Sequence, residues 1–490
     1  MIRPLVRIAV AAMCGVIVQA TTPAIGAWER FHGDAANRGF ADVNTKPAAG
    51  GSLSVPGLGT FAPGAGPVIA PDGTVYRGTQ EGKLIALHAD GKPFWSRQIE
   101  ADESIVASPA IGADGSVYVI GAKLKITKIG AIKKTQIGST LYAFNATGAL
   151  LARTPFPAGL RAPTTAPPNI VSVGGREIIL APAPYKNPHP TVKNGVDVRL
   201  IGFLPHGNVV LNELVAPQPG VDVITGGGLS LPELAEFIYC IPKPGITDIA
   251  ALIYCRLSGF YDYNPQRLPA PPPFPPSLPG IAVFTFAGGG APHVIVSDQR
   301  HTIVDFTVTG SKPRLTQVFR DGDPQRTLLS PPMVLPEGRT LASTAGEQIV
   351  FSGPNASQLA PVANQGIVYG PATLTVNGFA VVVGTNGLSL LKDAKMVSQS
   401  SLPPSYTSAA ASRTHVFVST TDAFITFDAD AQLELQRFDW VGGGKSPSAI
   451  GPDGRVYAIA SDILFIFPPP LKVSIPLTPG AVLQKDPGGQ

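Results

Sequence analysis

The chain has 490 residues, a length of about three ordinary domains, although repetitive all-β architectures often form longer single units. Gly 54 and Pro 51 make up about a fifth of the sequence, 44% of residues are hydrophobic and only 14% are charged. Disordered chains are poor in apolar residues, and long helices contain few Gly or Pro. The composition therefore excludes wholesale disorder, argues against a helical protein, and favours many short strands joined by tight turns.

The first residues have the pattern of an export signal. Arg3 and Arg7 precede an apolar stretch over residues 8–18, and small residues follow between Ala20 and Ala27. We therefore expect residues 1–27 to be a signal peptide and the mature protein to be periplasmic or secreted. The apolar run is too short to cross a bilayer, and no other stretch reaches the roughly 20 apolar residues of a transmembrane helix.

Charge and cysteine content agree with export. The net charge of +4 includes two arginines of the signal segment, so the mature chain is nearly neutral and gives no reason to expect a nucleic-acid partner. Cys240 and Cys255 remain as a single pair in an oxidising compartment, and we expect them to form a disulfide. A redox role is the alternative, but neither a C-x-x-C spacing nor a flanking positive charge at Cys240 favours it.

An internal repeat runs along the chain. Related stretches begin at Gly66, Ser108 and Ser446. Each begins with a small residue followed by Pro, continues with a short apolar strand and an Asp-Gly pair, and ends with a strand in which apolar and polar residues alternate. We predict two-residue hairpin turns at Asp72-Gly73, Asp114-Gly115 and Asp453-Gly454, with positive φ at both central residues. Units are predicted to start near Pro67, Pro109, Pro163, Pro292, Pro331, Pro371, Ala409 and Pro447. All but two intervals are close to forty residues, the length of a four-stranded blade.

Eight starts predict an all-β chain in which residues 28–490 form a β-propeller of four-stranded antiparallel blades. Eight blades are expected, and seven is the alternative count. The last unit supplies about three strands before Pro468-Pro469-Pro470. A segment between Trp28 and Gly66 is therefore expected to complete it and join the two ends of the chain.

The stretch from Trp28 to Gly39 resembles the W-x-x-F-x-G-D-x-x-x-x-G opening of bacterial propellers with pyrroloquinoline quinone-like (PQQ-like) repeats, and Ala86 to Trp95 resembles their A-x-D-A-x-x-G-x-x-x-W repeat. The resemblance specifies a fold far better than a function. Positions corresponding to Trp95 are predicted at Ala152, Leu211, Arg314, Ser398 and Leu435. The tryptophans that join blades in the dehydrogenase branch are therefore mostly missing.

Residues 220–280 interrupt the repeat between its third and fourth units. Two apolar stretches, residues 232–241 and 247–257, suit short helices, and Leu268 to Pro279 is rich in proline. We expect a small, partly helical insertion closed by the disulfide. Aromatic residues are enriched at interfaces, so four tyrosines are candidate partner-binding residues, with packing onto the propeller as the alternative: Tyr239, Tyr254, Tyr261 and Tyr263.

A basic run lies in a stretch without acidic residues from Ser116 to Arg176. Its lysines are Lys123, Lys125, Lys128, Lys133 and Lys134. We predict an elongated, exposed hairpin or loop. The alternative is contact with an anionic partner such as a membrane surface or an envelope polymer.

Catalytic chemistry has little support in the sequence. A quinoprotein dehydrogenase needs a flat platform under its quinone and a calcium or lanthanide ion. In the dehydrogenase branch of these propellers, a disulfide between adjacent cysteines also covers the cofactor. This chain has no adjacent pair of cysteines. Only Trp28, Trp95 and Trp440 offer indole rings, and no C-x-x-C-H haem signature is present. Asp321-Gly322-Asp323 and Asp428-Ala429-Asp430 lack the full ligand set of a calcium loop, and we predict that they are hairpin turns.

We therefore predict no catalytic or metal-binding residues and no cofactor, and we favour a monomeric binding or scaffolding module of the bacterial cell envelope. Its partner would be a protein or another envelope component. The nearest functional analogue is the propeller lipoprotein of outer-membrane protein assembly. The alternative is a PQQ- and calcium-dependent quinoprotein dehydrogenase that acts on an alcohol or a sugar.

Overall fold

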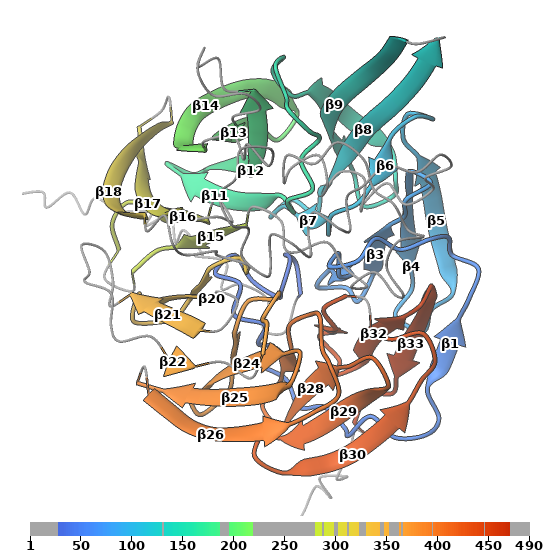
Figure 1. Cartoon of the computed structure of the whole chain (residues 1–490). Coiled ribbons are helices and arrows are strands. Elements are labelled where there is room, and N and C mark those ends of the chain that lie inside the picture. Colours follow the sequence, from blue (N-terminus) through green and yellow to red (C-terminus); the bar gives the residue numbers. More distant parts are fainter. Residues whose placement is uncertain are drawn as a thin grey trace, which may run out of the picture.

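The computed structural model describes residues 28–129, 132–186, 196–218, 280–286, 289–297, 302–310, 313–322, 330–343, 347–351, 362–363, 366–393, 395–444 and 446–470. Within these ranges the strands form eight antiparallel sheets, seven with four strands and one with five. No helix occurs in them, and so none that is long and apolar enough to span a membrane. The sheets surround a common centre, with their first strands innermost (Figure 1). This arrangement is a β-propeller.

The sheets are numbered here in chain order. Sheet 1 contains β2 (Val68–Ile69), β3 (Val75–Gly78), β4 (Lys83–Leu87) and β5 (Pro93–Gln98). Sheet 2 contains β6 (Ser104–Ile105), β7 (Ala110–Ile111), β8 (Val117–Ile129), β9 (Ile132–Phe144) and β10 (Leu150–Pro155). Its β7 corresponds to the first strand of the other sheets, and β6 is an additional strand that pairs with β8 further along. Sheet 3 contains β11 (Asn169–Val173), β12 (Arg176–Lys186), β13 (Val196–Leu204) and β14 (Gly207–Gln218). Sheet 4 contains β15 (Ile281–Phe284), β16 (His293–Ser297), β17 (Thr302–Thr309) and β18 (Arg314–Gly322).

The remaining sheets repeat this order. Sheet 5 contains β19 (Met333–Val334), β20 (Thr340–Ser343), β21 (Glu347–Phe351) and β22 (Val362–Ala363). Sheet 6 contains β23 (Thr373–Leu374), β24 (Ala380–Gly384), β25 (Gly387–Lys392) and β26 (Lys395–Ser401). Sheet 7 contains β27 (Ala410–Ala411), β28 (His415–Ser419), β29 (Ala423–Asp428) and β30 (Glu434–Asp439). Sheet 8 contains β31 (Ala449–Ile450), β32 (Val456–Ala460), β33 (Ile463–Phe467) and β1 (Leu53–Val55).

Sheet 8 joins the two ends of the described chain. Its outermost strand is β1, which pairs with β33 through Leu53↔Ile466, Ser54↔Phe465 and Val55↔Leu464. The prediction that a segment between Trp28 and Gly66 completes the last unit is confirmed. A ring closed in this way leaves only short, protected sheet edges.

The Asp-Gly pairs lie in the turns between first and second strands, as predicted, but the turn type differs. Gly73 has a φ of 87°, whereas Asp72 is not among the residues with positive φ. Gly73 N donates to Ala70 O, and Ala70 N donates to Thr74 O. The loop therefore has three residues, a type I turn followed by a left-handed glycine, rather than a two-residue hairpin. Asp72 stabilises it by accepting a bond from Thr74 N at 2.8 Å.

Burial explains why the inner strands are apolar and the outer strands alternate. Every residue of β32 is buried, whereas β30 alternates between exposed and half-buried residues. In sheets 1, 6, 7 and 8 the second and third strands are largely buried, because neighbouring sheets cover both of their faces, while the fourth strand is largely exposed to solvent. The core therefore consists of the layers between adjacent sheets.

Four local predictions are wrong. Arg314, predicted to correspond to Trp95, pairs with Thr309 at the start of β18, whereas the first paired residue after the bulge of that strand is Phe319. Pro292 precedes β16, the second strand of sheet 4, because the sheet already begins at Ile281, where Pro279-Gly280 supplies another small-residue start. Asp321 and Gly322 are the last residues of β18 rather than a turn. Leu435 lies in a bulge between the pairs Phe427↔Glu434 and Thr426↔Gln436.

In β5, Trp95 is the first paired residue after a bulge and lies opposite Ala86. In β30, the first paired residue after the bulge is Gln436, so Gln436 rather than Leu435 corresponds to Trp95. By contrast, the turn predicted at Asp428 is confirmed. Its carboxylate accepts bonds from Gln432 N at 2.7 Å and Leu433 N at 3.2 Å.

Candidate functional site

The segment Trp28–Ala41, called the axial segment from here on, crosses the centre of the ring (Figure 1). Four of its carbonyl groups accept bonds from first strands: Val283 N to Ala35 O at 2.7 Å, Val334 N to Ala36 O at 3.0 Å, Leu374 N to Arg38 O at 2.7 Å and Ala411 N to Gly39 O at 2.7 Å. A first strand has a free inner edge, and the axial segment satisfies backbone groups on that edge that would otherwise lack partners.

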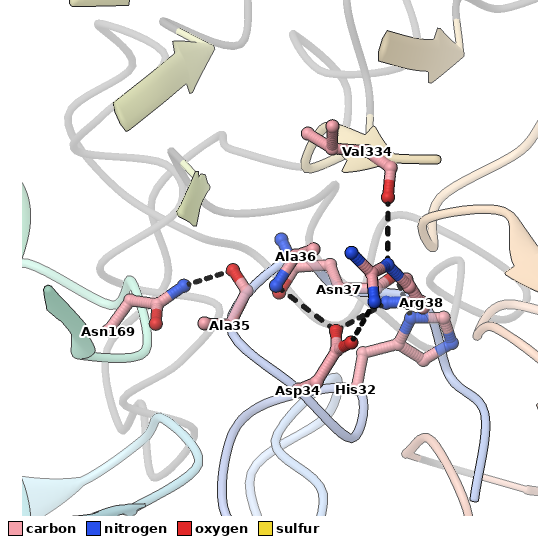
Figure 2. Close-up of polar contacts among 8 residues, drawn as sticks. All are labelled: His32, Asp34, Ala35, Ala36, Asn37, Arg38, Asn169 and Val334. Atoms are coloured by element: carbon pink, nitrogen blue, oxygen red, sulfur yellow. Dashed lines mark hydrogen bonds and ion pairs between the residues drawn. The ribbon is translucent and has the colours of Figure 1, made fainter. Parts of the chain in front are cut away.

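The axial segment also bonds to the first three sheets. Trp28 and Ile69 exchange two backbone bonds, of 3.2 and 2.8 Å, and Ile111 N donates to Glu29 O at 2.9 Å. The side-chain amide of Asn169 donates to Ala35 O at 2.8 Å (Figure 2). The segment therefore contacts first strands of sheets 1, 2, 3, 4, 5, 6 and 7. Several of these residues are the last of their strands, so the segment lies at the end of the axis that carries the first turns.

A compact turn shapes the segment. Asp34 Oδ1 accepts bonds from Ala36 N and Arg38 N, each at 3.0 Å, and the Arg38 guanidinium lies 3.3 Å from Asp34 Oδ2 (Figure 2). Arg38 Nε also donates to Val334 O at 3.2 Å. Local structure therefore accounts for Asp34 in the opening motif, because its short side chain accepts bonds from the backbone N–H groups two and four residues later.

Asn37 adds side-chain bonds to sheets 4 and 5, which the backbone of the segment already contacts. Its φ is 57° and its side chain is 1% exposed. The side-chain amide donates to Ile281 O and to Pro332 O, each at 2.9 Å. Asn tolerates the left-handed conformation better than most residues. Asn37 therefore fits both the positive φ at this position and the two buried hydrogen bonds of its side chain.

His32 is buried at the same place. Its Nδ1 lies 2.7 Å from Asn37 O, and its Nε2 lies 2.9 Å from Ala409 O and 3.1 Å from Thr373 Oγ1. Desolvation lowers the pKa of His32, and the two carbonyl oxygens and the Asp34 carboxylate oppose this effect only in part. A Cβ on Gly39 would lie 2.4 Å from the imidazole ring, so a glycine is required there.

A group of ionisable side chains lies where the segment begins. The Arg30 Nη1 donates to Ile111 O, and Ala113 N donates to the Glu177 carboxylate at 3.0 Å. Burial lowers the pKa of Arg30 and raises that of Glu29. Arg30 Nε and the Tyr118 hydroxyl find no hydrogen-bond partner within the described part of the chain. The Arg30 guanidinium therefore bonds the start of the segment to sheet 2, and the Glu29 and Glu177 carboxylates favour its charged form.

A second buried pair, His293 and Asp305, joins β16 to β17. His293 Nδ1 lies 3.0 Å from both carboxylate oxygens, and burial raises the pKa of Asp305 although the histidine opposes this. Phe286 contacts the imidazole edge-on at 5.2 Å. Within the described ranges no hydroxyl bonds to His293. No sequence motif reveals the pair, because the two residues belong to different strands.

The indole rings do not form a platform for a quinone. Trp28 is 1% exposed within the axial segment, Trp95 belongs to outermost strand β5, and Trp440 directly follows outermost strand β30. Trp95 Nε1 donates to Ala146 O at 2.9 Å, and Trp440 stacks on Phe424 at 5.4 Å. The described residues also contain no group of three or more His, Cys, Asp or Glu that could hold a metal ion. They therefore do not fit a stacked quinone with its metal.

The predicted partner-binding and disulfide residues lie outside the described residues. These are Tyr239, Tyr254, Tyr261, Tyr263, Cys240 and Cys255. The signal segment, residues 1–27, and residues 220–279 of the insertion also lie outside them. These assignments stay predictions.

No protein-family model and no curated protein matches the sequence. Among solved structures, quinohemoprotein alcohol dehydrogenase from Comamonas testosteroni aligns with a TM-score of 0.60 and 12% identity, over 91% of this chain and 81% of that one. Sqt1 from Saccharomyces cerevisiae aligns with a TM-score of 0.51 and 12% identity, over 86% and 98%. BamB from Moraxella catarrhalis aligns with a TM-score of 0.49 and 11% identity, over 84% and 98%. The resemblance to PQQ-type β-propeller proteins is thereby confirmed, at the level of the fold.

Proposed function

We propose that the chain is an exported, eight-bladed PQQ-like β-propeller that acts as a binding or scaffolding module of the bacterial cell envelope. The eight sheets support the blade count. The signal-like residues 1–27 and the pair Cys240 and Cys255 support export into an oxidising compartment.

The axial segment is the observation that carries this proposal. It occupies one end of the propeller axis, and Trp28 and His32 on it are each 1% exposed. Its polar groups bond to the chain's own first strands. Groups already bonded within the protein are not available to orient a substrate or a quinone. Recognition is therefore expected on the outer surface.

The insertion, residues 220–280, is the part of that surface we favour for a partner. The exposed aliphatic side chains of the ring lie mainly on its outermost strands, as with Leu150, Leu214 and Val397. Segments added to a rigid scaffold commonly carry recognition. The four tyrosines and the Pro-rich stretch give this segment the composition of a binding surface.

A cofactor titration separates the two candidate classes. Purified mature protein is titrated with PQQ and calcium, and dye reduction is then assayed with a panel of alcohols and aldoses. We expect no stoichiometric quinone binding and no turnover. Stoichiometric binding with turnover would overturn the proposal in favour of a quinoprotein dehydrogenase.

A deletion tests where the partner binds. Replacing Gly220 to Pro279 by a short Gly-Ser linker should leave a folded propeller and abolish the main interaction in pull-downs from envelope extract. A matched control shortens the connection between β12 and β13, residues 187–195, and should retain the interaction. An unchanged partner set would show that the insertion is a structural cap, and an unfolded protein would show that it completes the core.

A further inference from the structure

Sheet 2 carries a two-stranded extension that the repeat does not need. Its strands β8 and β9 have 13 residues each, whereas β3 and β4 of sheet 1 have 4 and 5. The pairing of β8 with β9 is unbroken from Val117↔Phe144 to Ile129↔Ile132. The neighbouring strands β6 and β10 pair no further out than Ala122 and Thr140. Beyond them β8 and β9 protrude from the ring (Figure 1).

This extension, Lys123–Ile129 with Ile132–Gly138, is called the ribbon from here on. It contains five lysines and no acidic residue, whereas the whole chain has a net charge of only +4. Lys123 pairs with Asp102 at the base of the ribbon, and Lys125 is exposed. The ribbon therefore concentrates the positive charge of an otherwise nearly neutral protein at one protruding element.

The strand register opposes like charges. Lys128 lies directly opposite Lys133, and Lys134 lies opposite Thr127. Like charges directly opposite each other destabilise a strand pair, and a two-stranded hairpin without a third strand is itself only marginally stable. An anion bound at this level would remove the repulsion.

The order of residues along the ribbon distinguishes between anions. Near the base, Leu124 is 9% exposed and its partner Ile137 packs against the core between sheets 2 and 3. The lysine pair follows, and the last pair, beyond the lysines, is Ile129↔Ile132. An apolar pair beyond lysine positions at the end of a hairpin suits an interface in which lipid phosphates lie above hydrocarbon. A soluble polyanion would require no apolar end.

We infer that the ribbon binds an anionic lipid surface, with its lysines at the level of the lipid phosphates and the Ile129↔Ile132 end in the interfacial apolar layer. This inference does not depend on the proposed function, because it rests on the register, charge and position of the ribbon alone.

Vesicle binding tests the inference. Mature protein, residues 28–490, is sedimented with vesicles of phosphatidylcholine alone and with vesicles that also contain phosphatidylglycerol. We expect binding to the anionic vesicles only, with a strong salt dependence. Each lysine near an anionic surface strengthens binding by about fivefold. The variant Lys128→Gln with Lys133→Gln should therefore bind about 25-fold more weakly. The matched control is Lys83→Gln with Lys395→Gln, two exposed lysines on sheets 1 and 6, and should bind like the unaltered protein.

Two further variants keep the test decisive. Ile129→Ser with Ile132→Ser should weaken binding while leaving its salt dependence intact. Because Leu124 and Ile137 lie opposite each other, a two-residue Asn-Gly turn can join them and remove the outer ribbon. This variant should melt like the unaltered protein and lose vesicle binding.

Three results would overturn the inference: no binding of the unaltered protein to anionic vesicles, retained binding after removal of the outer ribbon, or an isoleucine variant that binds as tightly as the unaltered protein. The last result would show that charge alone holds the ribbon to the vesicle, without its apolar end.

Discussion

Leu53 and Ile466 lie opposite each other in sheet 8, so a strand near the start of the described chain completes the sheet near its end. The turn between β4 and β5 of sheet 1 packs against this junction, because a Cβ on Gly91 would lie 2.7 Å from Ile466 and 2.9 Å from Val55. Closure of the ring and packing of its first sheet are therefore coupled.

Gly91→Ala should destabilise the protein through this junction. Gly91 has a φ of 82°, so alanine costs about 1–2 kcal/mol of backbone strain, and overpacking against sheet 8 adds about 1–3 kcal/mol. Gly115→Ala is the control, because its φ is 79° and a Cβ there meets nothing within 4 Å. Denaturant unfolding of both variants measures the difference. Equal losses of stability would contradict the junction.

Asn37→Ala should also destabilise the protein. It removes the only described donor to Pro332 O and leaves that carbonyl unpaired, at about 1–3 kcal/mol, in addition to left-handed strain, whereas Ile281 O still accepts a bond from the Asn169 side chain. Asn208→Ala is the control, because Asn208 has a φ of 52° and is exposed. The free energy of unfolding should fall much further for Asn37→Ala than for the control. A similar loss in both would show that the two buried bonds contribute little.

Stability should fall as the pH is lowered through the range in which histidine titrates. Burial lowers the pKa of His32, whereas the unfolded chain has the ordinary value of about 6.5. Between these values the unfolded chain binds a proton that the folded chain does not, so stability is complete above about pH 6.5 and is lost toward the lower, folded-state pKa. Burial lowers the pKa of His415 as well, so that residue contributes with the same sign.

His32→Gln tests this pH dependence. The slope of Tm against pH between about pH 7 and 5 should become shallower, because one of the titrating groups is gone. His206→Gln, at an exposed turn position, is the control and should keep the slope of the unaltered protein. An unchanged slope in His32→Gln would contradict the account of the buried imidazole.

Protein recovered from the envelope should contain no free thiol. If residues 1–27 are removed, only Cys240 and Cys255 remain, and their disulfide should block alkylation until a reductant is added. Intact mass with and without reductant measures both events. Two alkylated thiols without reductant would refute the bond, and a mass that retains residues 1–27 would refute the cleavage.

Much of the fold is predictable from local sequence. The Asp-Gly pairs fix the first turns at Gly73, Gly115 and Gly454, because glycine takes a positive φ without strain. The elongated hairpin is likewise predicted from the run of Lys123 to Lys134, and the structure confirms it for the backbone. The prediction of a unit start at Pro292 is wrong because a similar small-residue start at Pro279-Gly280 precedes it. The prediction at Leu435 is wrong because a bulge shifts the register by one residue, to Gln436.

The role of the axial segment is not predictable in this way. The motif from Trp28 to Gly39 indicates a family of propellers, but its contacts with the sheets are with residues far away in the sequence. His32 meets Ala409, and Asn37 meets Ile281 and Pro332. Such partners become apparent only when the ring is assembled, because nothing in the composition of the segment specifies them.

Hydrogen exchange tests the central claim most directly. Val283 N, Val334 N, Leu374 N and Ala411 N donate to the axial segment, and without it they would face the axis of the ring. We predict that these amides exchange as slowly as the core of β32, through global unfolding. Fast exchange at these four amides, with slow exchange in β32, would show that the axial segment does not occupy the centre of the propeller.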